Sequence, residues 1–333
     1  MSSRINQFTE IAKKDPKKIV FPEGLEARIL EAAAKATALG VADIILIGEE
    51  KSVKDIAAKN NISLEGIEIV DPERYDKKEQ LVELFHDLRK HKGMTIEEAR
   101  KIVLGDFVYF GALLVRTGAA DGFVAGASYT TSDVARAAIY CLEPDKSVGV
   151  VSSSFIIELE DSPYGEDGLF VFGDCGIVPN PDAKRLAGIA ISSSRLYEKI
   201  FKAKPRTALL SYSTKRSAKG ESVEKVRQAL EIIKKEAPDL AVDGELQLDA
   251  AIVPEVAAIK APSSPIAGKA NVLIFPNLDA GNIAYKLIQR LGKARVAGPL
   301  LQGVTKPCSD LSRGCGVREI VDSVAVTVIR AQT

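Results

Sequence analysis

The chain has 333 residues, enough for a substantial core and for two domains. Its 45 Lys and Arg residues balance 45 Asp and Glu residues, so no overall charge draws the protein toward nucleic acid or a membrane surface. No stretch approaches the roughly 20 apolar residues that span a bilayer, and the first residues form no apolar signal core, so a cytoplasmic protein is predicted.

The first third of the chain alternates apolar runs with helical patterns. Alanine content predicts a helix over residues 27–39, the spacing of apolar side chains predicts another over 81–93, and a capping box predicts one long helix over 95–116. Ser132 or Asp133 is expected to cap the helix that follows. The predicted strands are residues 19–21, 42–47, 67–70 and 121–126.

The same alternation continues to the C-terminus. The predicted strands there are residues 148–159, 168–172, 208–211 and 272–275. The predicted helices are residues 183–200, 223–235, 279–291 and 317–330. A mixed apolar run at 246–252 has no assigned type, and the chain returns through 294–298 to a loop that ends at the last helix.

Strands that are continuous apolar runs separated by helices favour parallel sheets. We therefore predict an α/β fold of two domains with mostly parallel sheets. The boundaries are placed near residues 148 and 298. Residues 1–148 and 299–333 would form the first domain, and residues 149–298 the second.

Three hydroxyl groups follow the strand at 121–126, on Ser128, Thr130 and Thr131. Ligands of open α/β sheets bind at the carboxyl ends of strands, so these hydroxyls and the backbone N–H groups of the loop suit a phosphate. Ordinary turn and cap chemistry is the alternative.

Arg89 and Arg136 lie before and after this loop in the sequence. Bidentate guanidinium groups match the pyrophosphate and 3′-phosphate of a CoA-type ligand. A solvated helix face is the alternative for each. Arg290 ends a predicted helix, where the helix dipole favours a cation in any case.

The loop before the last predicted helix carries a hydroxyl, a guanidinium and a thiol within four positions, at Ser312, Arg313 and Cys315. Exposed N–H groups at a helix start, beside Ser and Arg, suit a phosphate or a developing oxyanion. A helix cap beside a surface arginine is the alternative. Cys315 fits either a nucleophile with a depressed pKa or a small buried hydrophobic residue.

Other catalytic classes lack their usual residues. The two histidines, His86 and His91, lie in one segment, and no G-x-G-x-x-G, G-x-x-x-x-G-K-[ST] or G-x-S-x-G pattern supports a nicotinamide, ATP-hydrolysing or α/β-hydrolase function. The four cysteines have no zinc-finger spacing and are expected to be free thiols, so no metal site is predicted.

Several tracts together closely resemble the phosphate acetyltransferase family over essentially the full chain. The matching tracts are residues 88–93, 120–126, 133–136, 174–175, 179–181, 243–247, 275–282 and 310–315. No single tract is decisive, but the order and spacing of the tracts together make the resemblance specific.

The resemblance implies reversible transfer of an acetyl group between CoA and phosphate, with no prosthetic group. It implies an isocitrate-dehydrogenase-like architecture of two α/β domains, an active site in the cleft between them, and a homodimer. CoA, acetyl phosphate and phosphate would be the small-molecule partners.

The resemblance also implies roles for individual residues. Ser312 and Arg313 would hold the oxyanion and the departing phosphate. Arg89, Arg136 and Arg290 would bind CoA or phosphate, and Ser128, Thr130 and Thr131 would face the acyl phosphate. Six residues after the motif arginine, the family commonly has an Asp that is proposed as the general base. This chain has Glu319 at that position, and Asp322, one turn further, is the second candidate for the base.

Three rival functions remain at the level of sequence. The first is a phosphate butyryltransferase with a longer acyl substrate. The second is a non-catalytic, CoA-binding regulatory domain, and the third is an oxidoreductase of the same architecture. A covalent route through acetylated Cys315 is the rival mechanism.

Overall fold

The computed structural model describes residues 4–332, which divide into two compact units. The split unit contains residues 4–144 and 304–332, and the central unit contains residues 145–303. These divisions lie near the boundaries predicted at 148 and 298, but residues 299–303 belong to the central unit. That each unit is a domain in its own right stays a prediction.

The split unit is built on a parallel sheet with the strand order β3-β2-β1-β4-β11. Its strands are β1 (Lys17–Phe21), β2 (Ala42–Ile47), β3 (Glu68–Val70), β4 (Gly122–Ala125) and β11 (Cys308–Asp310). Apolar runs such as Ile19–Phe21 are fully buried, as expected for a parallel sheet covered by helices.

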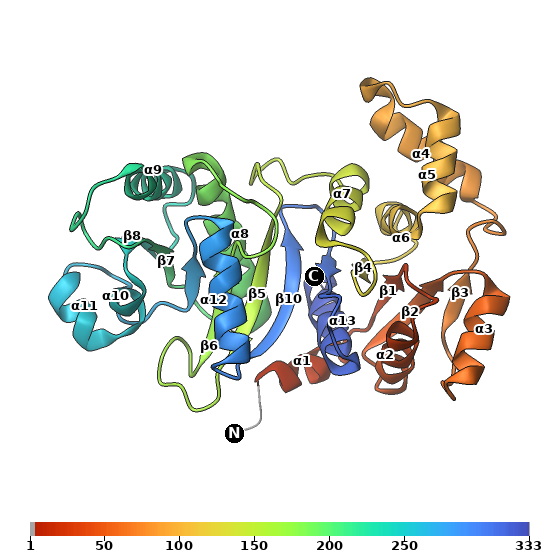
Figure 1. The fold of residues 1–333 in the computed structure, drawn as a ribbon, viewed down its shortest axis with the longest axis horizontal. Coiled ribbons are helices and arrows are strands. Elements are labelled where there is room, and N and C mark those ends of the chain that lie inside the picture. The colour runs from red at the N-terminus through yellow and green to blue at the C-terminus, as the bar shows by residue number, and fades with distance from the viewer. Residues whose placement is uncertain (1–3, 333) are drawn as a thin grey trace. The chain divides into compact units, whose positions relative to one another are not determined.

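The helices of this unit come from both ends of the sequence. They are α1 (Arg4–Ala12), α2 (Ala27–Ala38), α3 (Glu50–Lys59), α4 (Lys78–Arg89), α5 (Ile96–Gly105), α6 (Phe107–Arg116), α7 (Thr131–Cys141) and α13 (Val317–Ala331). Figure 1 shows α13, in blue, beside α1 and α2, in red, and it also contacts β4 and β1. Ile320, Val324 and Val328 of α13 are fully buried, so the C-terminal helix is part of the core of this unit.

The central unit has a mixed sheet with the strand order β10-β5-β6-β9-β7-β8. Its strands are β5 (Ser152–Glu158), β6 (Leu169–Gly173), β7 (Thr207–Leu210), β8 (Val242–Leu246), β9 (Val272–Ile274) and β10 (Arg295–Gln302). The pairs β10–β5 and β5–β6 are antiparallel, and the other pairs are parallel.

Five helices complete the central unit: α8 (Ala183–Phe201), α9 (Glu221–Glu236), α10 (Leu248–Ile252), α11 (Pro254–Lys260) and α12 (Leu278–Arg290). Aromatic side chains fill its core. The rings of Phe155 and Tyr285 stack with centroids 4.3 Å apart, and those of Phe172 and Phe275 meet edge-on at 5.2 Å.

The predicted α/β class with mostly parallel sheets is confirmed. The single long helix predicted over 95–116 is wrong, because α5 ends at Gly105 and Asp106 caps a new helix by accepting the N–H of Val108. The strand β11 was not predicted, since three residues that include Ser309 and Asp310 do not form an apolar run. The run at 246–252 turns out to be the end of β8 followed by α10.

Candidate functional site

Three neighbouring strands of the split unit end at the same edge of its sheet. Because β1, β4 and β11 are parallel and adjacent, the loops after them lie side by side. We call residues 22–26, 126–130 and 311–316 the edge loops. They lead directly to α2, α7 and α13.

The last edge loop presents Ser312 and Arg313 to solvent. The hydroxyl of Ser312 has one long contact, an N–H donated by Gly314 at 3.4 Å. The guanidinium of Arg313 donates to no group within residues 4–332, while its backbone carbonyl is held by Arg28. A cation and a hydroxyl are therefore adjacent and open to an anion.

Glu319 and Asp322 lie in the first turns of α13. The carboxylate of Glu319, which is half-buried, accepts the N–H of Gly316 at 2.8 Å and so stabilises the start of the helix. Asp322 is only 7% exposed. Glu319 is the more accessible of the two candidate bases and is three residues from Gly316 in the edge loop.

The Cys315 thiol is 6% exposed. Burial, opposed by the Arg28 charge and reinforced by Glu319, raises its pKa to about 11. The thiol therefore lacks the depressed pKa of a nucleophile. Of the two interpretations of this residue, its environment favours the small buried hydrophobic one.

The three hydroxyls of the 126–131 segment all donate to carboxylates. The bonds, 2.6 to 2.7 Å long, join Ser128 to Glu23, Thr130 to Asp133 and Thr131 to Asp310. Thr130 is the N-cap of α7, and Asp133 returns the interaction in a capping box, so the predicted cap at Ser132 or Asp133 is wrong by two or three residues. The turn and cap hydrogen bonds that were the alternative interpretation of these hydroxyls are therefore present. The lone pairs of the three hydroxyl oxygens can still accept hydrogen bonds from other donors.

The backbone N–H groups of this loop also have a partner that was not predicted. Glu23, on the loop after β1, accepts the N–H groups of four consecutive residues at 2.5 to 3.2 Å. The donors are Gly126, Ala127, Ser128 and Tyr129. The expectation that these N–H groups bind a phosphate is therefore corrected, because a buried protein carboxylate already takes them.

Arg28 is the second residue that sequence reasoning missed. Its guanidinium donates to the carbonyls of Ala127, Arg313 and Cys315 at 2.9 to 3.0 Å. Glu26 accepts from its Nε at 2.9 Å and orients it. The only signal in the sequence was the polar segment after Pro22 where the first strand stops.

Arg89 and Arg136 both lie against α7 or on it. The guanidinium of Arg89 stacks 3.7 Å above the ring of Tyr140, and its Nε is buried without a hydrogen-bond partner. Arg136, one helical turn before Tyr140, is exposed and pairs with Asp133 at 3.3 Å. Two cations predicted to bind one ligand are thus associated with one helix.

Arg290 is the predicted site residue that belongs to the central unit. It is the last residue of α12 and is exposed. Its role stays a prediction.

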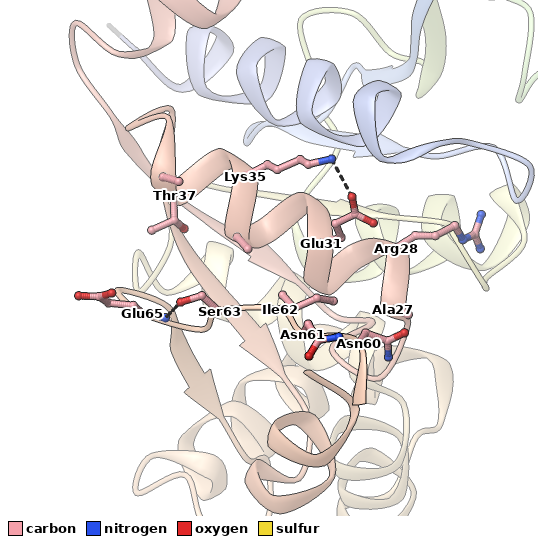
Figure 2. Close-up of a pocket in the computed structure, with 12 residues that line it drawn as sticks. Ala27, Arg28, Glu31, Lys35, Thr37, Asn60, Asn61, Ile62, Ser63 and Glu65 are labelled. Carbon is pink, nitrogen blue, oxygen red and sulfur yellow. Dashed lines mark hydrogen bonds and ion pairs between the residues drawn. The ribbon is translucent and has the colours of Figure 1, made fainter. Parts of the chain in front are cut away.

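A groove of about 690 Å³ runs beside α2, between this helix and residues 60–65 (Figure 2). It contains none of the predicted site residues. Lys35 and Glu31 on its wall pair at 2.7 Å, and Arg28 stands at one end. The groove offers a ligand little unpaired charge, so we place the candidate site at the edge loops.

Within residues 4–332, no three His, Cys, Asp or Glu side chains are arranged to hold a metal ion. In the same range, no helix has the length and apolar character needed to cross a membrane.

Comparison with known proteins identifies the class. The family model described as Phosphate acetyl/butaryl transferase matches residues 3–328, and the chain belongs to this family. It is 49% identical to the phosphate acetyltransferase of Acetivibrio thermocellus over 330 residues, covering 99% of this chain and 98% of that protein.

Two further comparisons agree in their coverage. The chain is 48% identical to the phosphate acetyltransferase of Clostridium acetobutylicum over 328 residues, covering 98% of each protein. The crystal structure of a phosphotransacetylase from Streptococcus pyogenes superposes with a TM-score of 0.92 at 39% identity, covering 99% of each chain.

Proposed function

We propose that this chain is a phosphate acetyltransferase, which interconverts acetyl-CoA plus phosphate with CoA plus acetyl phosphate. The observation that carries the proposal is the Ser312–Arg313 pair, a hydroxyl beside a guanidinium that has no partner within residues 4–332. This pair lies at the carboxyl edge of a parallel sheet, where α/β proteins bind ligands. The identity to phosphate acetyltransferases over nearly the whole chain supports the assignment.

We propose direct transfer in a ternary complex. Glu319 takes the proton from the CoA thiol, and the thiolate attacks the acetyl carbonyl of acetyl phosphate, forming the C–S bond. The tetrahedral oxyanion is held by Ser312 and Arg313. Its collapse breaks the bond from carbon to the bridging oxygen, and phosphate leaves with the electron pair.

The remaining predicted residues would bind the substrates. Arg89 and Arg136 would hold phosphate groups of CoA, and the side chains of Ser128, Thr130 and Thr131 would border the acyl phosphate. Arg290 would bind CoA or phosphate. No prosthetic group enters this reaction.

The test is an acyl-phosphate panel with purified protein. Mixing CoA with acetyl phosphate should raise thioester absorbance, and the rate with acetyl phosphate should exceed the rates with propionyl and butyryl phosphate. A higher butyryl rate would make the chain a phosphate butyryltransferase, the other activity that the family description names. Tight CoA binding without turnover would favour a regulatory domain instead.

We also propose a cytoplasmic homodimer. The four cysteines are all free and buried, as suits a reducing compartment. Helix α12 and the residue that caps its C-terminus expose Ile283, Leu287 and Leu291, at 58%, 51% and 78%, and their i, i+4, i+8 spacing puts them on one stripe. An apolar stripe of this kind supports a contact with a second copy.

A further inference from the structure

The segment from Glu23 to Arg28 contacts both of the other edge loops. The carboxylate of Glu23 accepts hydrogen bonds from backbone N–H groups, and the guanidinium of Arg28 donates hydrogen bonds to backbone carbonyls. Neither residue belongs to the set that the sequence assigned to substrate.

The carboxylate end fixes the loop after β4. Glu23 is 5% exposed and accepts four backbone N–H groups and the Ser128 hydroxyl. A buried carboxylate is costly unless donors surround it, and charge-assisted hydrogen bonds are about twice as strong as neutral ones. The N–H groups and the charge therefore stabilise each other, and residues 126–129 have one strongly preferred conformation.

The guanidinium end fixes the loop after β11. Arg28 donates to the carbonyls of Arg313 at 2.9 Å and Cys315 at 3.0 Å, on either side of Gly314. The same group donates to the Ala127 carbonyl at 3.0 Å, which ties the two loops together. The planar fork of an arginine can serve several acceptors at once, whereas a lysine ammonium cannot match that geometry.

We propose that Glu23 and Arg28 are positioning residues for the acetyl transfer, and this rests on the proposed function. Arg28 holds the main chain of Arg313 and so leaves the side chain of Arg313 available for the oxyanion and phosphate. Glu23 holds residues 126–129 in position beside the loop that carries Arg313. A misplacement of about 1 Å can cost about 100-fold in rate, so the order of these loops matters to kcat.

The first test is Arg28→Lys. We expect kcat to fall about 10- to 100-fold, while KM for CoA and acetyl phosphate changes less than about 3-fold, because alignment rather than binding is lost. Arg100→Lys is the matched control, since Arg100 pairs with Glu79 on an exposed helix face away from the edge loops. It should keep the wild-type kcat, and an unchanged kcat in Arg28→Lys would overturn the proposal.

The second test separates positioning from a general effect on folding. Because Arg28 acts through Arg313, Arg28→Lys should cost less than about 3-fold when added to Arg313→Ala. The same fold-loss in both backgrounds would overturn the proposal. Should Arg28→Lys fail to fold, Arg28→Gln is combined with Arg313→Ala in the same way.

The third test does not depend on acetyl transfer. In Glu23→Gln, one of the acceptor oxygens becomes an NH₂ donor, so the amides of residues 126–129 should exchange hydrogen at least about 10-fold faster than in the wild type. Glu98→Gln, in the exposed capping box of α5, is the control and should leave these amides unchanged. Unchanged exchange in Glu23→Gln overturns the positioning role. Faster exchange in Glu23→Gln, together with a wild-type protein that forms no acetyl-CoA, would instead refute the proposed function alone.

Discussion

At the scale of single residues, exposure and pairing distinguish the chemistry of neighbouring side chains. Arg313 is exposed and its guanidinium has no partner within residues 4–332, whereas Cys315, two residues on, is buried with a pKa raised by that burial. The sequence placed a thiol and a guanidinium in the same loop, but it could not tell which one faced solvent. The difference arises because the loop turns Cys315 under itself through a bond from its N–H to the Ser312 carbonyl.

We predict opposite outcomes for these two positions. Arg313→Ala should lower kcat/KM about 100- to 1,000-fold, the range seen when one oxyanion-stabilising group is removed. Cys315→Ala should stay within about 3-fold of the wild type, because a thiol with a pKa of about 11 is not ionised at neutral pH. Steady-state kinetics on both variants, with circular dichroism to establish folding, provides the check. A folded but inactive Cys315→Ala enzyme would favour the covalent route.

At the scale of elements, buried carboxylates organise the loops that follow strands. Glu23 does so after β1, and in the central unit Asp174, just after β6, accepts the N–H groups of Gly176, Ile177 and Val178 at 2.8 to 3.3 Å. Asp310 differs. It is fully buried at the end of β11, one oxygen accepts from Thr131, and the other has no partner within residues 4–332.

The environment of Asp310 predicts a pH-dependent stability. Burial, with Glu23 adding repulsion, raises the pKa of its carboxyl from 3.8 to about 7. The folded chain therefore keeps a proton on Asp310 that the unfolded chain loses near pH 3.8. The contribution of this protonated carboxyl to the free energy of unfolding is complete below pH 3.8 and is lost as the pH rises to about 7. Between these two pH values, the free energy of unfolding should fall by about 4 kcal/mol through this group.

Thermal unfolding across this range checks the prediction. The Tm of the wild type should fall between pH 4 and pH 7 relative to that of Asp310→Asn, which cannot ionise. Asp121→Asn is the control, because Asp121 is exposed, and its pH profile should follow the wild type. Parallel profiles for Asp310→Asn and the wild type would contradict a raised pKa.

Local patterns predicted the elements better than the contacts between them. The buried strands β1, β2 and β4 followed from local apolar runs, and the amphipathic helix α4 followed from the spacing of its apolar residues. Ser312 and Arg313 were predicted as site residues because their loop chemistry is visible in the sequence, and the structure shows both exposed; their roles stay a prediction. Glu23 and Arg28 were missed because their partners lie about a hundred or more positions away, and sequence spacing carries no record of that proximity.

At the scale of the whole molecule, the α12 stripe carries the prediction of a dimer. Leu287→Glu places a charge in the middle of the stripe and should convert the protein to a monomer, because burying an unpaired carboxylate at an interface is costly. Size-exclusion chromatography with light scattering measures the change. Leu39→Glu, at a similarly exposed leucine that follows α2, should leave the dimer intact. A wild-type monomer, or a dimeric Leu287→Glu variant, would contradict this interface.

The split unit has a consequence for the order in which the protein forms during synthesis. Arg28 and the carbonyl that it holds at Arg313 are 285 positions apart, so nearly the whole polypeptide must leave the ribosome before they can meet. Until then β4 lacks its neighbour β11, and the sheet has an open edge of the kind that pairs with other chains. The central unit, which is contiguous in sequence, can fold earlier. Catalytic competence is therefore the last property the nascent chain acquires.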